Sequence, residues 1–298
     1  METLNLKPRV NPILVDFPQR SEEWRQARLG NVTGSDGKKT FLGEASDIAR
    51  NAAIREILKV GQLNAKVKST PEFLELYEMD SVKLFELAGI PYPEPAARTQ
   101  YCRLKVAERL TGMDADPEGG FVTHDMKWGI ISEQLAKSMY ALETGNLITE
   151  APFMLHPDLR AGASPDGFVT EVTTGLTGVI ECKCLRSHNQ LYDIIKANEI
   201  PEEYMVQIHM EIWISGRDFC DFIGYDSRLP KGLEIYVKRV MRDDDYIDNV
   251  LEPEVRRFLD DVKRDETYFR IKIREEIERR KKEGLILLPE EAMELVNA

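Results

Sequence analysis

Three residues in two neighbouring segments of the chain have the side chains that a hydrolytic metal site needs. Asp166 follows Pro165 in a turn-forming sequence, and Glu181 and Lys183 lie further along in an apolar run. Side chains alternate between the faces of a strand, so Glu181 and Lys183 share one face and their apolar neighbours share the other. If the segment around Asp166 pairs with this strand, two carboxylates and an ammonium group come together.

Two carboxylates on adjacent strands suit a hard cation, because Mg²⁺ prefers oxygen ligands in octahedral geometry. Asp166, Glu181 and the backbone carbonyl of Cys182 are therefore predicted ligands. Lys183 cannot bind metal, and we expect it to steer the attacking water or stabilise charge on a phosphate. Each motif alone has a simpler interpretation, since Pro-Asp-Gly is a common turn and Glu-x-Lys is typical of a solvated strand face. Only their conjunction favours a site.

The helices and strands that must position these residues are predicted from hydrophobic periodicity, helix-capping residues, and prolines and glycines that end an element. Helices are predicted over residues 21–30, 47–60, 72–87, 98–110, 127–143, 202–215 and 246–282, and strands over 148–155, 161–170, 178–185, 221–225 and 233–240. In the helix 127–143 an apolar stripe is predicted to face the core, formed by Trp128, Ile131, Leu135, Met139 and Leu142. A mostly antiparallel sheet interrupted by one long helix predicts an α/β fold of mixed sheet type.

The chain is predicted to form one main domain over residues 14–268 and a charged helical tail over 269–298. Four prolines break any long element between residues 62 and 98. We interpret this stretch as a peripheral insertion that carries one short helix, 72–87.

Composition limits the classes of protein without selecting one. The 298 residues carry a net charge of −12, whereas most tight DNA binders are basic. Much of the acid lies in 72–94 and 243–294, so a locally basic groove stays compatible with the total. The four cysteines form no C-x-x-C pair, which argues against a zinc ribbon. With no secretory signal pattern and no apolar run near the ~20 residues that cross a bilayer, we expect a cytoplasmic protein without a membrane partner.

Asp166 followed by Glu181-Cys182-Lys183 resembles the D…E-x-K signature of the PD-(D/E)XK nuclease superfamily. A wider set of motifs is similar to the lambda-exonuclease, or YqaJ-like, phage recombination nucleases. In the family's order these are Trp24, Arg28-Leu29-Gly30, Thr33-Gly34-Ser35, Trp128-Gly129 with Glu133, Ala163–Gly167 and Tyr204–Gln207. The resemblance covers about residues 17–240 and implies a restriction-endonuclease-like α/β fold, with a central mixed β-sheet flanked by helices.

The resemblance adds three residues to the catalytic and metal set. Glu133 would be a further metal ligand, although its place on the helix by itself indicates an exposed charge. Tyr204 and Gln207 would complete the catalytic set with Asp166, Glu181 and Lys183; three residues apart, they share one helical face. A structural hydrogen bond from a half-buried glutamine is the alternative for Gln207.

A second implied group, Arg28, Ser35 and Ser164, would bind the 5′-phosphate of a DNA end. A guanidinium suits a phosphate because it offers paired N–H donors. Sequence position alone gives Arg28 the role of a cation at a helix C-terminus and Ser35 that of an N-cap.

By resemblance, the protein would be a Mg²⁺-dependent 5′-to-3′ double-strand DNA exonuclease that releases 5′-mononucleotides and leaves 3′ single-stranded tails for recombination. Two Mg²⁺ ions per site are implied, with Mn²⁺ as a substitute. Members of the family form rings of three on double-stranded DNA ends and partner with a single-strand annealing protein. They come from phages or prophages and act in the bacterial cytoplasm. Two alternatives stay open: another PD-(D/E)XK endonuclease, and a non-catalytic DNA-binding or assembly protein on the same scaffold.

Overall fold

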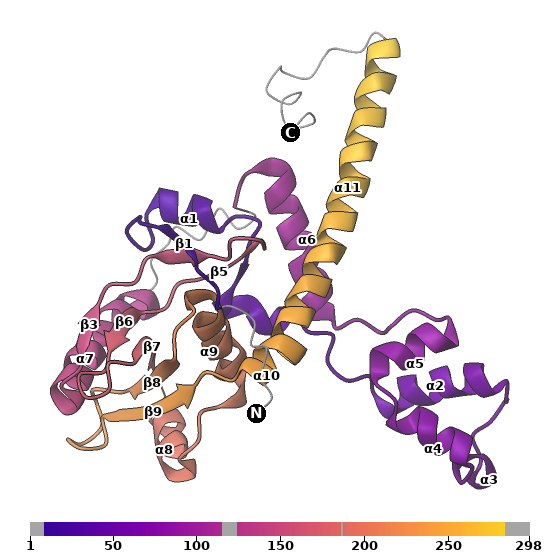
Figure 1. The fold of residues 1–298 in the computed structure, drawn as a ribbon. Helices are drawn as coiled ribbons and strands as arrows, with labels where there is room; N and C mark the ends of the chain where they lie inside the picture. Colours follow the sequence, from indigo (N-terminus) through magenta and orange to yellow (C-terminus); the bar gives the residue numbers. More distant parts are fainter. Residues whose placement is uncertain (1–8, 115–123, 186, 284–298) are drawn as a thin grey trace, which may run out of the picture. The chain divides into compact units, whose positions relative to one another are not determined.

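The computed structural model describes residues 9–114, 124–185 and 187–283, and the side chain of Trp128 lies outside the description. The chain forms two compact units, one of residues 41–100 and one of the residues before and after them (Figure 1). None of the helices within the described ranges is both long and apolar enough to span a bilayer.

The larger unit contains a five-stranded mixed sheet in the order β3-β6-β7-β8-β9. Its strands are β3 (Leu147–Thr149), β6 (Gly167–Thr170), β7 (Thr177–Cys184), β8 (Phe219–Tyr225) and β9 (Ile235–Met241). β7 and β8 pair in parallel, and the other neighbours pair antiparallel. The parallel pair needs a crossover connection, which holds α8 (His188–Ala197) and α9 (Glu202–Ser215). The predicted mixed sheet is confirmed, whereas α8 was not predicted.

A smaller sheet in the order β1-β4-β5-β2 lies in the same unit. Its strands are β1 (Ile13–Val15), β4 (Phe153–Leu155), β5 (Ala161–Ala163) and β2 (Val32–Thr33). The single strands predicted over 148–155 and 161–170 are wrong, because each is two strands that belong to different sheets. Pro152 and Pro165 mark the two breaks, since proline offers no N–H to a ladder. The second break carries Ser164 and Asp166 from one sheet to the other.

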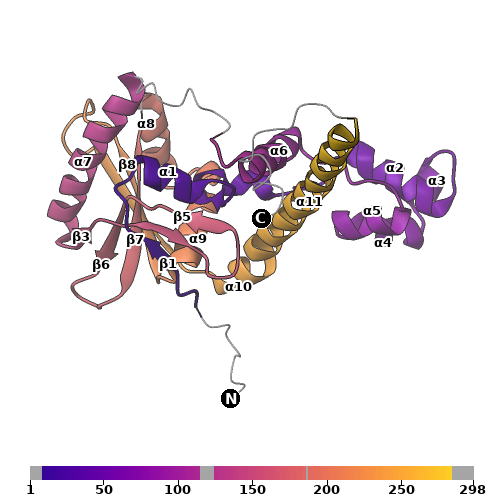
Figure 2. The same cartoon turned by 90° about the horizontal axis from the view of Figure 1, so that it is seen from above.

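Helix α7 (His124–Thr144) covers one face of the five-stranded sheet and α9 covers the other (Figures 1 and 2). Ala136 and Tyr140 of α7 pack into the core with Ile180 and Ile223 of the sheet. Strand alternation in β7 is therefore as predicted, with Ile180 toward the core and its neighbours toward α9.

The apolar stripe predicted to face the core on α7 is wrong at three of its five residues, whereas Met139 does pack against the core. Ile131, Leu135 and Leu142 are 64%, 47% and 85% exposed, whereas Ala136 and Tyr140 are fully buried. A small alanine lets the helix approach the sheet, and the Tyr140 hydroxyl is satisfied inside because it donates to Asp221 Oδ2 at 2.5 Å. A buried polar partner decides the orientation of this helix against its apolar periodicity.

The smaller unit is a group of short helices: α2 (Asp47–Leu58), α3 (Ala65–Lys68), α4 (Pro71–Glu78) and α5 (Ser81–Ala88). They share a core that includes Ile54, Phe73 and Leu84. The single helix predicted over 72–87 is wrong, because Asp80 starts a new helix by accepting from the Lys83 N–H at 3.1 Å. The unit contains the segment predicted as an insertion and also α2, and the predicted domain limits stay predictions.

The remaining helices frame the larger unit. They are α1 (Glu22–Arg28), the 3₁₀ helix η1 (Gly34–Thr40), α6 (Ala96–Thr111), α10 (Asp244–Tyr246), the π-helical turn η2 (Ile247–Leu251) and α11 (Glu252–Lys282). Ser21 is the N-cap of α1, since its Oγ accepts from the Trp24 N–H at 3.1 Å. The predicted tail begins within the continuous helix α11, and its residues 284–298 lie outside the described part of the chain.

Candidate active site

Glu181 and Lys183 form a buried ion pair on the face of β7 that α9 covers. Lys183 Nζ lies 2.6 Å from Glu181 Oε1, and Glu181 is only 4% exposed. A buried ion pair needs further hydrogen bonds to offset the loss of solvation. Gln207 supplies one, because Lys183 Nζ donates to Gln207 Oε1 at 3.0 Å.

Asp166 is fixed against the same strand by backbone hydrogen bonds. Its N–H donates to the Ile180 carbonyl at 3.0 Å, and the Cys182 N–H donates to Asp166 Oδ2 at 2.7 Å. This contact lies just beyond the last pair of the β6–β7 ladder, Gly167 opposite Ile180. The structure thus brings Asp166, Glu181 and Lys183 together. The group of Cys182 that contacts Asp166 is its N–H, and a role for its carbonyl as a metal ligand stays a prediction.

The carboxylates at this point repel one another. Burial raises the pKa of Asp166 well above its usual range, and the charges of Glu181 and Glu133 raise it further. The Cys182 N–H and the Lys137 ammonium oppose this rise without cancelling it. A divalent cation would relieve the repulsion, because it favours the ionised form of every nearby carboxyl group.

Glu133 faces the site from α7. Its side chain is mostly buried, although the helix pattern alone suggested an exposed charge. The Glu133 side chain is 16% exposed. Its Oε1 forms an ion pair with Lys137 Nζ at 2.6 Å, and its Oε2 lies 3.8 Å from Arg20 Nη2. Lys137 could have been identified in the sequence, because residues four apart on a helix are neighbours. Arg20 carries no such signal, and its φ of +72° is rare for a residue with a Cβ.

The carboxylate oxygens are suitable ligands for a hard cation, but two of the carboxylates form ion pairs with lysines. Among the residues described, no three histidine, cysteine or acidic side chains converge on one metal position. Lys137 holds Glu133, and Lys183 holds Glu181. A cation shared with Asp166 would compete with these lysines for the two carboxylates. The sulfur atoms of Cys182 and Cys184 offer no competing donors because both side chains pack against the core.

Tyr204 and Gln207 both contact Lys183 from α9. Lys183 Nζ lies 5.1 Å above the centre of the Tyr204 ring, and that ring stacks on Phe222 at 5.6 Å. Gln207 uses its other end to donate from Nε2 to Glu211 Oε1 at 2.9 Å. Glu211 was not predicted, although its spacing of four from Gln207 on an otherwise apolar helix face was a usable signal.

Glu211 is an acid in an enclosed position. It is 1% exposed, and its Oε2 has no hydrogen-bond partner among the described residues. Burial raises the pKa of Glu211 well above its usual range, and the neighbouring Glu181 charge adds to this rise. The shift favours the neutral acid, whose O–H would satisfy the neighbouring Glu181 carboxylate.

Arg28 ends α1 with its guanidinium stacked on aromatic rings. Its Cζ lies 4.2 Å from the Trp24 ring centre and 5.6 Å from that of Phe153. Burial lowers the pKa of Arg28, although the charge of Asp36 partly offsets the effect. Within the described ranges no carboxylate forms an ion pair with Arg28, so its donors remain available to a ligand.

Ser35 and Ser164 leave the smaller sheet at the same end of two paired strands. β2 and β5 run parallel with Thr33 opposite Gly162, and each serine lies two residues beyond its strand partner. The Ser35 and Thr33 hydroxyl oxygens are 3.4 Å apart. Ser164 Oγ accepts from Gln19 Nε2 at 3.2 Å. The structure therefore places Ser35 and Ser164 after the same end of two neighbouring strands and adds Gln19 beside Ser164, which the sequence did not indicate.

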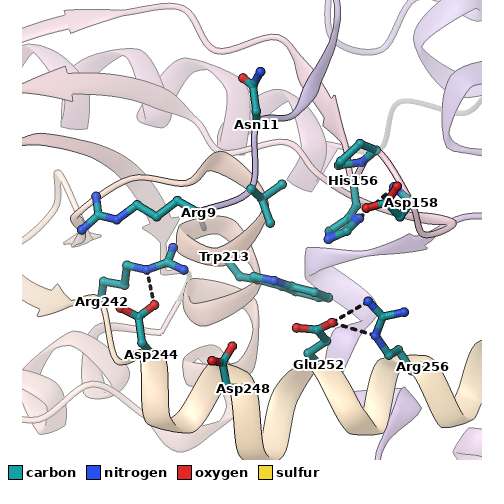
Figure 3. Close-up of a pocket in the computed structure, with 12 residues that line it drawn as sticks. Arg9, Asn11, His156, Asp158, Trp213, Arg242, Asp244, Asp248, Glu252 and Arg256 are labelled. Atoms are coloured by element: carbon teal, nitrogen blue, oxygen red, sulfur yellow. Dashed lines mark hydrogen bonds and ion pairs between the residues drawn. The ribbon is translucent and has the colours of Figure 1, made fainter. Parts of the chain in front are cut away.

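Two cavities lie outside this cluster. One, of about 430 Å³, opens beside Tyr204 and has the acids Asp193, Glu199, Glu202 and Glu203 in its wall, which disfavours a phosphate. The other, of about 300 Å³, is lined by Arg9, His156, Trp213, Arg242 and Arg256 among others (Figure 3). There Arg242 pairs with Asp244 at 2.5 Å and Arg256 with Glu252 at 2.6 Å, so these cations already have partners.

A mixed sheet with an aspartate at the start of one strand and Glu-x-Lys on the next, flanked by helices, is the PD-(D/E)XK nuclease fold, and the chain has this fold. Residues 94–218 match the model of the YqaJ-like viral recombinase domain. The match includes Asp166, Glu181 and Lys183 and leaves Arg28 and Ser35 outside.

Solved structures agree with this assignment over most of the chain. The alkaline exonuclease LHK-Exo from Laribacter hongkongensis is similar, with a TM-score of 0.59 and 26% identity over 86% of this chain and 99% of that one. The same enzyme in complex with dAMP gives a TM-score of 0.59 and 27% identity, over 86% of this chain and 99% of that one. No curated protein sequence is significantly similar to this chain.

Proposed function

We propose that this protein is a metal-dependent DNA exonuclease whose active site is centred on Asp166, Glu181 and Lys183. The observation that carries the proposal is the junction of β6 and β7, where the Cys182 N–H holds Asp166 beside the Glu181–Lys183 pair. The similar enzyme from Laribacter hongkongensis is named an alkaline exonuclease and binds a deoxynucleoside monophosphate in its complex. Both statements support phosphodiester hydrolysis on DNA.

Asp166, Glu181 and Glu133 would hold the metal, with the Cys182 carbonyl as a further ligand. We propose Mg²⁺, two ions per site with Mn²⁺ as a substitute, because the donor set contains only oxygen atoms. When bound, the cations supply positive charge to the phosphodiester and lower the pKa of water. The raised pKa of Asp166 supports this assignment, because it reports carboxylates that lack sufficient positive charge.

Lys183 would act on the reacting phosphate or on the attacking water. Once Glu181 turns to a cation, the Lys183 ammonium keeps its hydrogen bond to Gln207 and its contact with the Tyr204 ring. These two contacts hold a charged donor at a fixed point, so little reorganisation is needed when negative charge develops. Tyr204 and Gln207 would thus position the Lys183 ammonium group.

Arg28, Ser35 and Ser164 would hold the 5′-phosphate of a DNA end. The stacked guanidinium has donors without a paired carboxylate, and the two hydroxyls leave neighbouring strands on the same side. A pocket for a terminal phosphate restricts the enzyme to ends and sets 5′-to-3′ digestion. We therefore propose that it releases 5′-mononucleotides and leaves 3′ single-stranded tails, as a recombination enzyme would.

Partners and assembly complete the proposal. We propose a ring of three subunits on duplex DNA and a single-strand annealing protein as partner, in the cytoplasm of a bacterial host. A ring would also reconcile the net charge of −12 with DNA, since the acids can lie on the outside and the cations toward the bore.

The discriminating experiment compares a linear duplex with the same DNA as a covalently closed circle. We expect Mg²⁺-dependent nucleotide release from the linear form and none from the circle. Lys183→Ala should abolish release, whereas Lys231→Ala, a change at an exposed loop lysine, should not. Rapid cutting of the circle would instead indicate an endonuclease, and a wild-type protein that binds DNA without hydrolysis would indicate an assembly role.

A further inference from the structure

We propose that Glu211 is a positioning residue that sets the direction of the Gln207 amide and, through it, the position of the Lys183 ammonium. The inference rests on the proposed function, in which Lys183 acts on the phosphodiester. It adds to the site a residue that neither the D…E-x-K signature nor the tyrosine–glutamine pair includes.

The contacts form a continuous chain from β7 to α9. Lys183 Nζ donates to Gln207 Oε1 at 3.0 Å, and Gln207 Nε2 donates to Glu211 Oε1 at 2.9 Å. Glu211 also interacts with Glu181, which pairs with Lys183 at 2.6 Å. Two hydrogen bonds therefore join Lys183 to Glu211 through Gln207, and Glu181 lies beside this chain of contacts as the ion-pair partner of Lys183.

The chemistry of the two ends permits only one direction for the amide between them. An ammonium group can only donate, and the Glu211 oxygen that faces Gln207 accepts whether the acid is ionised or carries its proton on the other oxygen. With Lys183 on one side and Glu211 on the other, Gln207 must present its oxygen to the lysine and its nitrogen to the acid. If Glu211 is replaced by an apolar residue, the amide can rotate and face Lys183 with its own N–H groups, which repel the ammonium.

Packing prevents Glu211 from leaving this position. It is 1% exposed, and η1 closes over it: a Cβ on Gly34 would lie 3.7 Å from Glu211 Cγ and 3.8 Å from Gln207 Cγ. One turn later, a Cβ on Gly37 would lie 3.0 Å from Met210 Cγ. The glycines thus let η1 approach α9 closely and enclose the hydrogen bond between Gln207 and Glu211.

A purely structural role accounts poorly for an acid at this position. Residues 208, 210 and 212 are buried and apolar, and a buried acid loses solvation that a leucine of similar size would not lose. Helix packing alone would therefore favour an apolar side chain at residue 211. An acid here is explained by the acceptor that it provides to Gln207.

The first test compares Glu211→Leu with Glu211→Gln, and Glu202→Gln serves as the control for an exposed acid on the same helix. We expect Glu211→Leu to lower kcat about 10- to 100-fold, because Lys183 is misplaced, with the Kd for linear duplex in Ca²⁺ changed by less than about threefold. Glu211→Gln keeps an acceptor oxygen for Gln207 and should retain kcat within about fivefold. Unchanged kcat in Glu211→Leu, or equal losses in both variants, would overturn the inference.

A charge-conserving exchange tests the direction of the amide even if Glu211→Leu does not fold. Gln207→Glu alone places two acids against each other and should reduce kcat strongly. In Gln207→Glu with Glu211→Gln, residue 207 again accepts from Lys183 and residue 211 donates to it. We expect kcat to recover at least about tenfold over the single variant; no recovery would contradict the positioning role. Equal activity of Lys183→Ala and wild type would instead contradict the proposed function. Failure of the positioning role and failure of the proposed function therefore give different results.

Discussion

Replacement of Arg28 should make digestion indifferent to the phosphate at the 5′ end of the substrate. The guanidinium is fixed over Trp24 at 4.2 Å and has no carboxylate partner in the described structure, so it is free to bind an anion without first breaking an ion pair. A hydrogen bond to a charged group contributes about 1.5–3 kcal/mol. Removing the 5′-phosphate from the substrate should therefore lower kcat/KM of the wild type about 10- to 150-fold.

The assay compares nucleotide release from two linear duplexes that differ only in a 5′-phosphate or a 5′-hydroxyl. In Arg28→Ala the ratio of the two kcat/KM values should fall to within about threefold. The ratio is taken within each protein, so any loss of packing against Trp24 and Phe153 cancels. Arg25→Ala is the matched control, because Arg25 lies in the same helix but is exposed and pairs with Glu22 at 3.0 Å. Equal phosphate dependence in Arg28→Ala and wild type would refute the role of Arg28 in binding the end.

Three further predictions concern the metal site. The pKa of Asp166 is raised in the folded protein, so ionisation favours the unfolded chain and destabilises the metal-free fold as pH rises above the unfolded value of about 3.9. Asp166→Asn should therefore unfold at a higher temperature than wild type near pH 7 in EDTA, with the difference lost near pH 4; a difference independent of pH, measured by calorimetry, would contradict this. Mg²⁺ should raise the melting temperature of the wild type and have little effect on Asp166→Asn. Calcium should bind and support little turnover, because its looser coordination positions water poorly; brisk cleavage in Ca²⁺ would count against the site as described.

The parts of the site that the sequence could predict are those set by strand alternation. Glu181 and Lys183 had to share a face, and the residues that alternate with them had to turn to the core, as Ile180 and Cys182 do. The turn at Pro165 predicted the position of Asp166 beside that strand. The same proline also divides the strand between two sheets, which the sequence pattern did not show.

The residues that were missed are those defined by contacts between distant segments. Arg20 reaches Glu133, and Gln19 reaches Ser164, and only the fold brings these separate segments together. Lys137 differs, because it lies four residues from Glu133 on the same helix. Helix α7 was predicted in the wrong rotation for a related reason. Its apolar stripe was visible in the sequence, whereas the buried Asp221 that accepts from Tyr140 lies in a strand far along the chain.

The most direct test of the central claim follows label from each end of a linear duplex in Mg²⁺. We predict that a 5′-³²P label is released at once as a mononucleotide, while a 3′ label stays in the surviving strand. Lys183→Ala or EDTA should abolish release of the 5′ label. Release of the 3′ label first, or equal release by wild type and Lys183→Ala, would contradict an exonuclease built on Asp166, Glu181 and Lys183.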